Sequence, residues 1–119
     1  MLPAGARLRR QSEFSGVLRG GARASSPSAV VHVVVSGEPC GPRAGLVVGK
    51  SVGRAVERNL VKRRLRHIVR DRLDRLPDGA RVVVRALPGA AARPFAELSR
   101  DIDRALPDAL RKAAARAAR

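Results

Sequence analysis

Acidic residues are scarce in this sequence. It has 10 Asp and Glu against 25 Lys and Arg, which gives a formal net charge of +15 at pH 7. The codon usage of a GC-rich genome explains why Arg is preferred to Lys, but it does not explain so large an imbalance. Because unbalanced like charges repel one another in a folded chain, the composition favours a polyanionic partner. Nucleic acid is the favoured partner, ahead of a membrane surface or an acidic protein.

Cysteine and long apolar runs are also nearly absent. Cys40 is the single cysteine, so the chain cannot form an internal disulfide bond or a zinc site made of several thiolates. No apolar run is long enough to cross a bilayer. The N-terminal arginines are not followed by the apolar segment of a secretory signal. These absences predict a cytoplasmic protein with no membrane partner.

Aromatic residues are rare as well. The chain has two Phe and neither Trp nor Tyr, although 45% of its 119 residues are hydrophobic. Its core must therefore consist of Val, Leu, Ile and Ala. A chain of this length supports one modest core, so residues 1–119 are expected to form a single domain. Within it, residues 1–10 are a basic arm that we expect to be poorly ordered, and residues 111–119 are a basic tail that is either helical or frayed and disordered.

The pattern along the chain predicts alternating helices and strands. Ser12 is suited to cap a helix that Gly20 and Gly21 end, and a loop rich in Ser, Ala and Pro follows. β-branched runs predict strands, and Pro-Asp-Gly at 77–79 is expected to end a long helix. Pro94 is placed to open the last helix, which Pro107 would interrupt. The expected helices and strands are 12–21, 29–36, 44–50, 52–76, 80–87 and a helix from 94.

This order of elements predicts the fold class. Few strands and several helices indicate an α/β (α+β) two-layer sandwich, in which helices cover one face of a small sheet. The long helix would pack through its apolar stripe, which consists of Val61, Leu65, Ile68 and Val69.

The long helix carries most of its charge on another side. Basic residues recur at four-residue spacing, with Asn59 and Arg63 beside them within an arc of about 140°. A solvated helix face usually alternates the sign of its charges, whereas Glu57 is the only acid between Gly45 and Arg70. This face is therefore interpreted as a phosphate-binding surface. The repeating basic residues are Arg58, Lys62, Arg66 and Arg70.

The sequence shows no constellation typical of an active site. His32 and His67 lie on different elements, and a histidine in a Val-rich strand is more often packed than catalytic. Asp71, Asp74 and Asp78 are the only acids clustered on one continuous segment, at the end of the long helix. Asp71 is spaced to pair with Arg75, and Asp78 belongs to the turn, so a metal site is not favoured there. We predict neither a catalytic side chain nor a protein metal site.

Three segments resemble the protein subunit of bacterial ribonuclease P. The most specific reads GLVVGKSVGRAVERNLVKRRLR, in which a strand ending in Lys50 leads into a helix carrying Arg-Asn and then Lys-Arg. The flanking segments RLRRQSEFSGVLRGG and GARVVVRAL resemble the same family, so the likeness extends from Arg7 to Leu106. The resemblance implies a mixed sheet with a left-handed crossover around the long basic helix.

The resemblance also implies a function. In that family a large catalytic RNA hydrolyses the phosphodiester with Mg²⁺, which the RNA mainly binds. The protein binds this RNA and the 5′ leader of precursor tRNA, and it assists the cleavage that gives the mature 5′ end. The chain would thus be a subunit of a ribonucleoprotein endoribonuclease without catalytic side chains of its own.

Residue by residue, the resemblance assigns two surfaces. The leader-binding cleft would contain Phe14, Leu18 and His32. The RNA-binding surface, to which charge and spacing add Arg54 and Arg70, would consist of Lys50, Arg54, Arg58, Asn59, Lys62, Arg63, Arg66 and Arg70.

The chain departs from the family pattern at three positions, one of which is His32, where the family often has an aromatic residue. Leu60 replaces the third member of Arg-Asn-Arg, and Arg63 or Arg64 is a candidate to supply the missing charge. Leu18 replaces a frequent aromatic residue, so the cleft is poor in rings. Leader binding is therefore expected to depend more on charge, and more steeply on salt, than on stacking.

Two other functions are compatible with the charge and size of the chain. A structural RNA-binding protein, such as a small ribosomal protein, is the alternative, although it would not need the cleft residue Phe14 beside the basic helix. A DNA-binding protein is weaker, because no helix-turn-helix precedes the long helix. DNA is not an expected partner.

Overall fold

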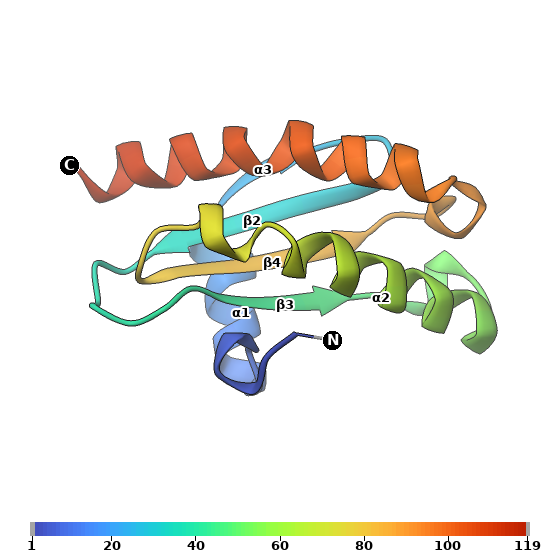
Figure 1. The fold of residues 1–119 in the computed structure, drawn as a ribbon, viewed down its shortest axis with the longest axis horizontal. Coiled ribbons are helices and arrows are strands. Elements are labelled where there is room, and N and C mark those ends of the chain that lie inside the picture. The colour runs from blue at the N-terminus through green and yellow to red at the C-terminus, as the bar shows by residue number, and fades with distance from the viewer. Residues whose placement is uncertain (1, 119) are drawn as a thin grey trace.

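The computed structural model describes residues 2–118, which form a four-stranded mixed sheet and three α-helices (Figure 1). The expected α+β class with a small mixed sheet is confirmed. Short 3-10 turns occupy Ala4–Ala6, Lys50–Val52, Leu73–Arg75 and Ala90–Ala92. The main elements are α1 (Gln11–Gly20), β1 (Ala22–Ser25), β2 (Ala29–Val35), β3 (Arg43–Val47), α2 (Ala55–Arg70), β4 (Ala80–Ala86) and α3 (Phe95–Ala117).

The strands lie in the order β1-β2-β4-β3. β2 is antiparallel to both β1 and β4, whereas β3 is parallel to β4, so α2 makes a crossover between parallel strands. In Figure 1 β3 and β4 run from left to right with β4 above β3, and α2 returns on the side that faces the viewer. The crossover is therefore left-handed, as expected, although about 98% of such connections are right-handed.

The main core lies between one face of the sheet and the helices α2 and α3. Val31, Val33 and Val82 alternate into it from the central strands. All four residues expected on the apolar stripe of α2 are buried there, which confirms that prediction: Val61, Leu65, Ile68 and Val69.

The opposite face of the sheet holds a second, smaller core. Leu8 and Val17 are buried against Val83, and Phe14 and Leu18 pack against them. α1 therefore lies behind the sheet in Figure 1, so helices occupy both faces rather than the single face expected.

The long helix is shorter than the sequence pattern indicates. It begins at Ala55 rather than at position 52, because Gly53 has a φ of 151°, which L side chains rarely adopt. The Arg54 N–H then donates to Glu57 Oε1 at 3.0 Å and satisfies one of the free donors of the first turn. Regular α-helix ends at Arg70, and a 3-10 turn at Leu73–Arg75 replaces the expected last turn.

The last helix is longer than expected, because Pro107 lies inside it without ending it. Pro107 is exposed, while Ala105, Ala109 and Ala113 are buried at four-residue spacing against the sheet. Packing of this small-residue face outweighs the local cost of proline. Of the two alternatives for the basic tail, the structure has the helical one, since residues 111–117 continue α3; positions 1 and 119 lie outside the described residues.

The first 25 residues also differ from expectation. Residues 2–10 pack on the sheet instead of forming a disordered arm: Leu2 and Leu8 are buried, and the Leu8 N–H donates to the Ala44 carbonyl at 3.0 Å. α1 begins at Gln11, so Ser12 lies within it and does not cap it. The segment expected as a loop contains β1, whose residues ARAS lack the β-branched character that predicts a strand.

Candidate nucleic-acid interface

The sheet face that carries α1 is strongly basic. Arg43, Arg81 and Arg85 alternate with the core-facing residues of β3 and β4, and Arg23 does the same on β1. Two acids moderate this charge, since Glu13 lies 3.5 Å from Arg43 and Glu38 lies 3.1 Å from Arg81. The face remains cationic beside the apolar residues of α1.

Phe14 lies on this face directly over the backbone of Gly45. A Cβ at Gly45 would overlap Cε1 and Cζ of the Phe14 ring and would lie 3.3 Å from Leu8 Cβ. Glycine is therefore required here for a close approach of ring and strand. The ring remains half-buried, so part of it faces solvent.

Substituting Gly45 by alanine is therefore expected to push the Phe14 ring off the strand. If the ring helps to hold single-stranded RNA, the affinity that depends on the leader should fall about fivefold or more, because one base–aromatic stack contributes on the order of 1–3 kcal/mol. The measurement is the affinity for precursor tRNA with and without its leader.

Gly16→Ala is the matched control for Gly45→Ala. Gly16 lies in α1, and a methyl group added to it would meet no atom within 4 Å. Alanine there should leave binding unchanged and slightly stabilise the helix. Equal binding by Gly45→Ala and the unmodified protein would contradict the assigned role of Phe14.

A hollow of about 280 Å³ connects Phe14 with the basic helix around the edge strand β3. Lys62 and Arg66 of α2 line one side of it, and Phe14 with Gly45 lines another. Residues expected to bind leader and residues expected to bind RNA thus meet in one depression. Its remaining lining comes from the N-terminal segment and β3: Leu2, Arg7, Leu8, Ala44 and Leu46.

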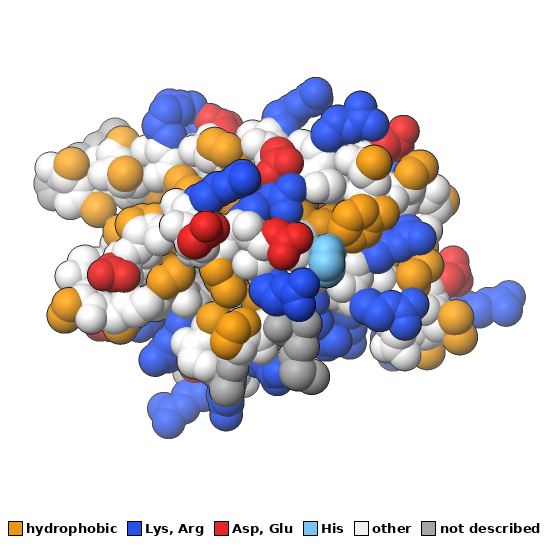
Figure 2. Space-filling view, in the orientation of Figure 1, with side chains coloured by type: hydrophobic (Ala, Val, Ile, Leu, Met, Phe, Trp, Pro, Cys, Tyr) orange, Lys and Arg blue, Asp and Glu red, His pale blue; other side chains and the backbone are white. Residues whose placement is uncertain are grey.

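The residues predicted for RNA binding lie along α2 and the turn before it. Basic side chains gather over the lower right of the surface in Figure 2, where α2 lies. Arg58 and Lys62 are half-buried because they border the core, and Arg58 Nε is buried without a hydrogen-bond partner among the described residues. The other six are exposed: Lys50, Arg54, Asn59, Arg63, Arg66 and Arg70.

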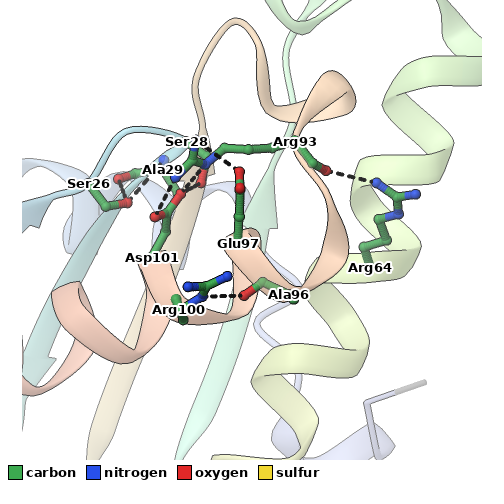
Figure 3. Close-up of polar contacts among 9 residues, drawn as sticks. All are labelled: Ser26, Ser28, Ala29, Arg64, Arg93, Ala96, Glu97, Arg100 and Asp101. Carbon is green, nitrogen blue, oxygen red and sulfur yellow. Dashed lines mark hydrogen bonds and ion pairs between the residues drawn. The ribbon is translucent and has the colours of Figure 1, made fainter.

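The contacts of α2 distinguish the two candidates for replacing the charge absent at Leu60. Arg64 Nη1 donates to the Arg93 carbonyl at 3.1 Å, so its guanidinium is directed to α3 (Figure 3). Arg63 is exposed on the outer face. Arg63 is therefore the better placed of the two to meet a phosphate.

The expected pair of Asp71 with Arg75 is not formed. Asp71 lies 3.4 Å from His67 Nε2 and 3.7 Å from Arg70 Nε, while Arg75 lies 3.9 Å from Asp103. The reason is that α2 ends at Arg70, so the chain turns away before position 75. Within residues 2–118, no group of three or more His, Cys, Asp or Glu side chains is arranged to hold a metal ion.

His32 lies on the α1 face of the sheet but is buried, with 4% of its surface exposed. Neither ring nitrogen has a hydrogen-bond partner among the described residues. Burial, together with the nearby charges of Arg85 and Arg23, lowers the pKa of the imidazole, so the ring is neutral at pH 7. His32 therefore adds no charge to the cleft, and Phe14 and Leu18 are its more accessible residues.

A second basic hollow was not predicted from the sequence. It measures about 500 Å³ and joins the N-terminal segment to β3, and the RLRR run of the first ten residues is the sequence feature that could have indicated it. Glu13 lies in it, and the hydrogen bond from the Arg10 backbone lowers the pKa of that carboxyl. Its lining residues are Gly5, Arg7, Arg9, Arg10, Ser12, Glu13 and Arg43.

Comparison with known proteins identifies the family. The ribonuclease P family model matches residues 2–110. The chain belongs to the ribonuclease P protein family. The ribonuclease P protein component of Streptomyces griseus is 54% identical over 114 residues, covering 89% of this chain and 93% of the relative. That of Acidothermus cellulolyticus is 53% identical over 107 residues, covering 89% of both chains.

Solved structures of ribonuclease P proteins have the same fold. The protein from Staphylococcus aureus matches with a TM-score of 0.78 at 22% identity, covering 87% of this chain and 94% of that one. The protein from Thermotoga maritima matches with a TM-score of 0.71 at 26% identity, covering 88% and 96%. Membership of the ribonuclease P family makes the chain a subunit of a ribonucleoprotein endoribonuclease of tRNA processing, with RNA as a partner. It decides against the ribosomal alternative.

Proposed function

We propose that this chain binds the catalytic RNA of ribonuclease P through the basic face of α2 and binds the 5′ leader of precursor tRNA in the cleft beside α1. The observation that carries the proposal is the hollow in which Phe14 of the cleft meets Lys62 and Arg66 of α2. A strand of RNA in this depression would contact a ring on one side and cations on the other. Both kinds of contact tolerate differences in sequence, as leaders require.

In this proposal the RNA subunit, with its own Mg²⁺, carries out the cleavage. The reaction takes place in the cytoplasm, where precursor tRNA is made. Three carboxylates of α3 are engaged by arginines: Asp101 by Arg93, Asp103 by Arg72 and Asp108 by Arg111. A carboxylate held this way is a poor ligand for a catalytic metal pair. The protein would act by positioning substrate and by neutralising phosphate charge.

The experiment is cleavage of precursor tRNA by the cognate RNA subunit at low Mg²⁺, with and without the protein. We expect the protein to restore accurate 5′ cleavage. The double substitution Arg58→Ala, Asn59→Ala should weaken this rescue about tenfold, because it removes one phosphate contact and one polar contact from the start of α2.

Arg100→Ala is the control for the double variant, since Arg100 is an exposed arginine on α3, away from the hollow. It should leave the rescue intact. If the protein binds the RNA tightly but leaves cleavage at low Mg²⁺ unchanged, the proposed function is wrong.

A further inference from the structure

Phe95 is an exposed aromatic residue in a chain that has only two phenylalanines. It is 40% exposed and begins α3 directly after Pro94. Its backbone is fixed beside α2, because Arg64 Nη1 donates to the carbonyl of Arg93, two residues earlier (Figure 3). With 40% of its surface exposed, Phe95 is accessible to a partner.

The Phe95 ring rests against His67 of α2. The two ring centroids lie 5.6 Å apart with an interplanar angle of 59°, a tilted arrangement typical of aromatic pairs. His67 is held in turn, since Nε2 lies 3.4 Å from the Asp71 carboxylate and Nδ1 lies 3.2 Å from Arg70 Nη2. The pair is thus an exposed aromatic surface in which both nitrogens of the His67 ring have a neighbouring charged group.

The surroundings of this pair combine apolar and cationic side chains. Leu60 and the 80% exposed Val56 lie on the same face of α2 as His67, about two and three turns nearer the start of the helix. Arg63, Arg64 and Arg70 flank His67 at positions three or four residues away. Figure 2 shows a histidine beside a hydrophobic patch, with an acidic side chain against it on the left and basic side chains below it and farther to the right.

The chemistry that fits such a surface is an unpaired nucleotide, whose base stacks on a ring while its phosphate meets a guanidinium. Phenylalanine and arginine are enriched at protein interfaces too, but a stable interface buries about 800 Å² on each partner around an apolar centre, which one partly exposed ring does not offer. Phe95 also lies with α2 and α3, on the face of the sheet opposite to Phe14. The leader cleft and this surface are therefore separate places.

We propose that Phe95, supported by His67, is a stacking site for an unpaired base of the catalytic RNA. This inference rests on the proposed function, because it requires the same RNA to bind α2. The inference adds Phe95 as a contact with the catalytic RNA that lies outside both the basic face of α2 and the leader cleft.

The absence of tryptophan and tyrosine provides a direct test. Phe95→Trp places a single indole at the site, and stacking of a base should quench its fluorescence when the catalytic RNA is added. Subsequent addition of precursor tRNA with its leader should change it little. Phe14→Trp is the matched reporter, whose fluorescence should respond to the leader.

The two proposals fail in distinguishable ways. If the Phe95→Trp holoenzyme assembles and restores cleavage but its fluorescence does not change on addition of the RNA, the stacking site is wrong and the proposed function stands. If neither reporter responds and cleavage is not restored, the proposed function itself fails.

Binding measurements separate stacking from packing. Phe95→Leu keeps apolar bulk against His67 but removes the aromatic face, so affinity for the catalytic RNA should fall about tenfold, as expected for one lost stack. Phe95→Tyr should retain the affinity, and both variants should unfold at the temperature of the unmodified protein. Equal affinity of the leucine and tyrosine variants would overturn the inference, because a purely apolar contact would explain it.

Discussion

The double substitution Lys62→Glu, Arg66→Glu is expected to lower the affinity of the chain for its RNA by about 100-fold or more at 0.1 M salt. Each phosphate contact with a single strand contributes a slope of about −0.7 to the dependence of log K on log salt, or about fivefold in affinity at that concentration, and the introduced carboxylates add repulsion. Both residues line the hollow that contains Phe14, so reversing their charge would repel a strand placed there. Filter binding across a salt series measures both quantities.

The salt series also tests how the leader is held. The cleft offers one half-buried phenyl ring and a neutral His32, so the affinity that depends on the leader should fall steeply with salt. In the Lys62→Glu, Arg66→Glu variant the slope should become shallower by about 1.4, about 0.7 for each lost contact with the single strand. A shallow slope in the unmodified protein would count against binding dominated by charge.

Arg100→Glu, Arg104→Glu is the matched control for this variant. It makes the same change in net charge at the same four-residue spacing, on the exposed side of α3. α3 mixes acids with its arginines, and its exposed arginines are distant from the hollow. If both double variants lost affinity equally, the effect would come from net charge and not from the hollow.

The basic helix was the part of the structure that its sequence predicted best. The apolar residues of α2 repeat with helical period, which predicted that Arg66 and Arg70 would lie on the side of the helix away from the core. Its limits were predicted less well. Gly53 enforces a turn that the apolar pattern does not indicate, and the Arg54 to Glu57 hydrogen bond fixes the start one turn later.

Other features depend on contacts between residues far apart in the sequence. The hollow brings Phe14 within the same depression as Lys62 only because β3 lies at the edge of the sheet. β1 has no β-branched residue, yet its pairing with the Val-rich β2 makes it a strand. Pro107 is tolerated because α3 is packed on both sides of it. No local sequence pattern predicts these features, because each depends on contacts between distant parts of the chain.

Substitution of Asp101 by alanine is expected to destabilise the fold by about 2–3 kcal/mol. Asp101 is buried and accepts a hydrogen bond from Ser28 Oγ at 2.5 Å and two from Arg93 at 2.6 and 3.0 Å (Figure 3). Removing the carboxylate leaves the buried Ser28 hydroxyl without this acceptor. Because Arg93 is partly exposed, it can turn to water, which keeps the cost below that of a fully buried pair.

The measurement is the free energy of unfolding in urea at pH 7, with Ser28→Ala as the control. Ser28→Ala removes a single hydrogen bond and should cost about 1 kcal/mol. The Arg93 carbonyl accepts from Arg64, so loss of the Asp101 contact should also loosen the junction of α2 and α3. Equal stability of Asp101→Ala and the unmodified protein would show that this network does not stabilise the fold.

The same network makes stability depend on pH. Burial acts to raise the pKa of the Asp101 carboxyl, but the hydrogen bonds from Arg93 and Ser28 outweigh it and hold the pKa below its usual value. The Arg72 hydrogen bond likewise lowers the pKa of Asp103. In acid, the unfolded chain therefore binds more protons than the folded chain. The stability that these carboxylates contribute is complete above their unfolded pKa of about 4, and it is lost as pH falls through the pKa values of Asp101 and Asp103 in the folded protein.

Unfolding titrations from pH 7 to pH 3 should therefore show stability falling below about pH 4, and Asp101→Asn should flatten part of that fall. Asp101→Asn keeps the shape of the side chain but cannot titrate. A variant that lost stability at pH 7 and yet kept the full acid dependence would place the responsible carboxylate elsewhere, with Asp103 the next to substitute.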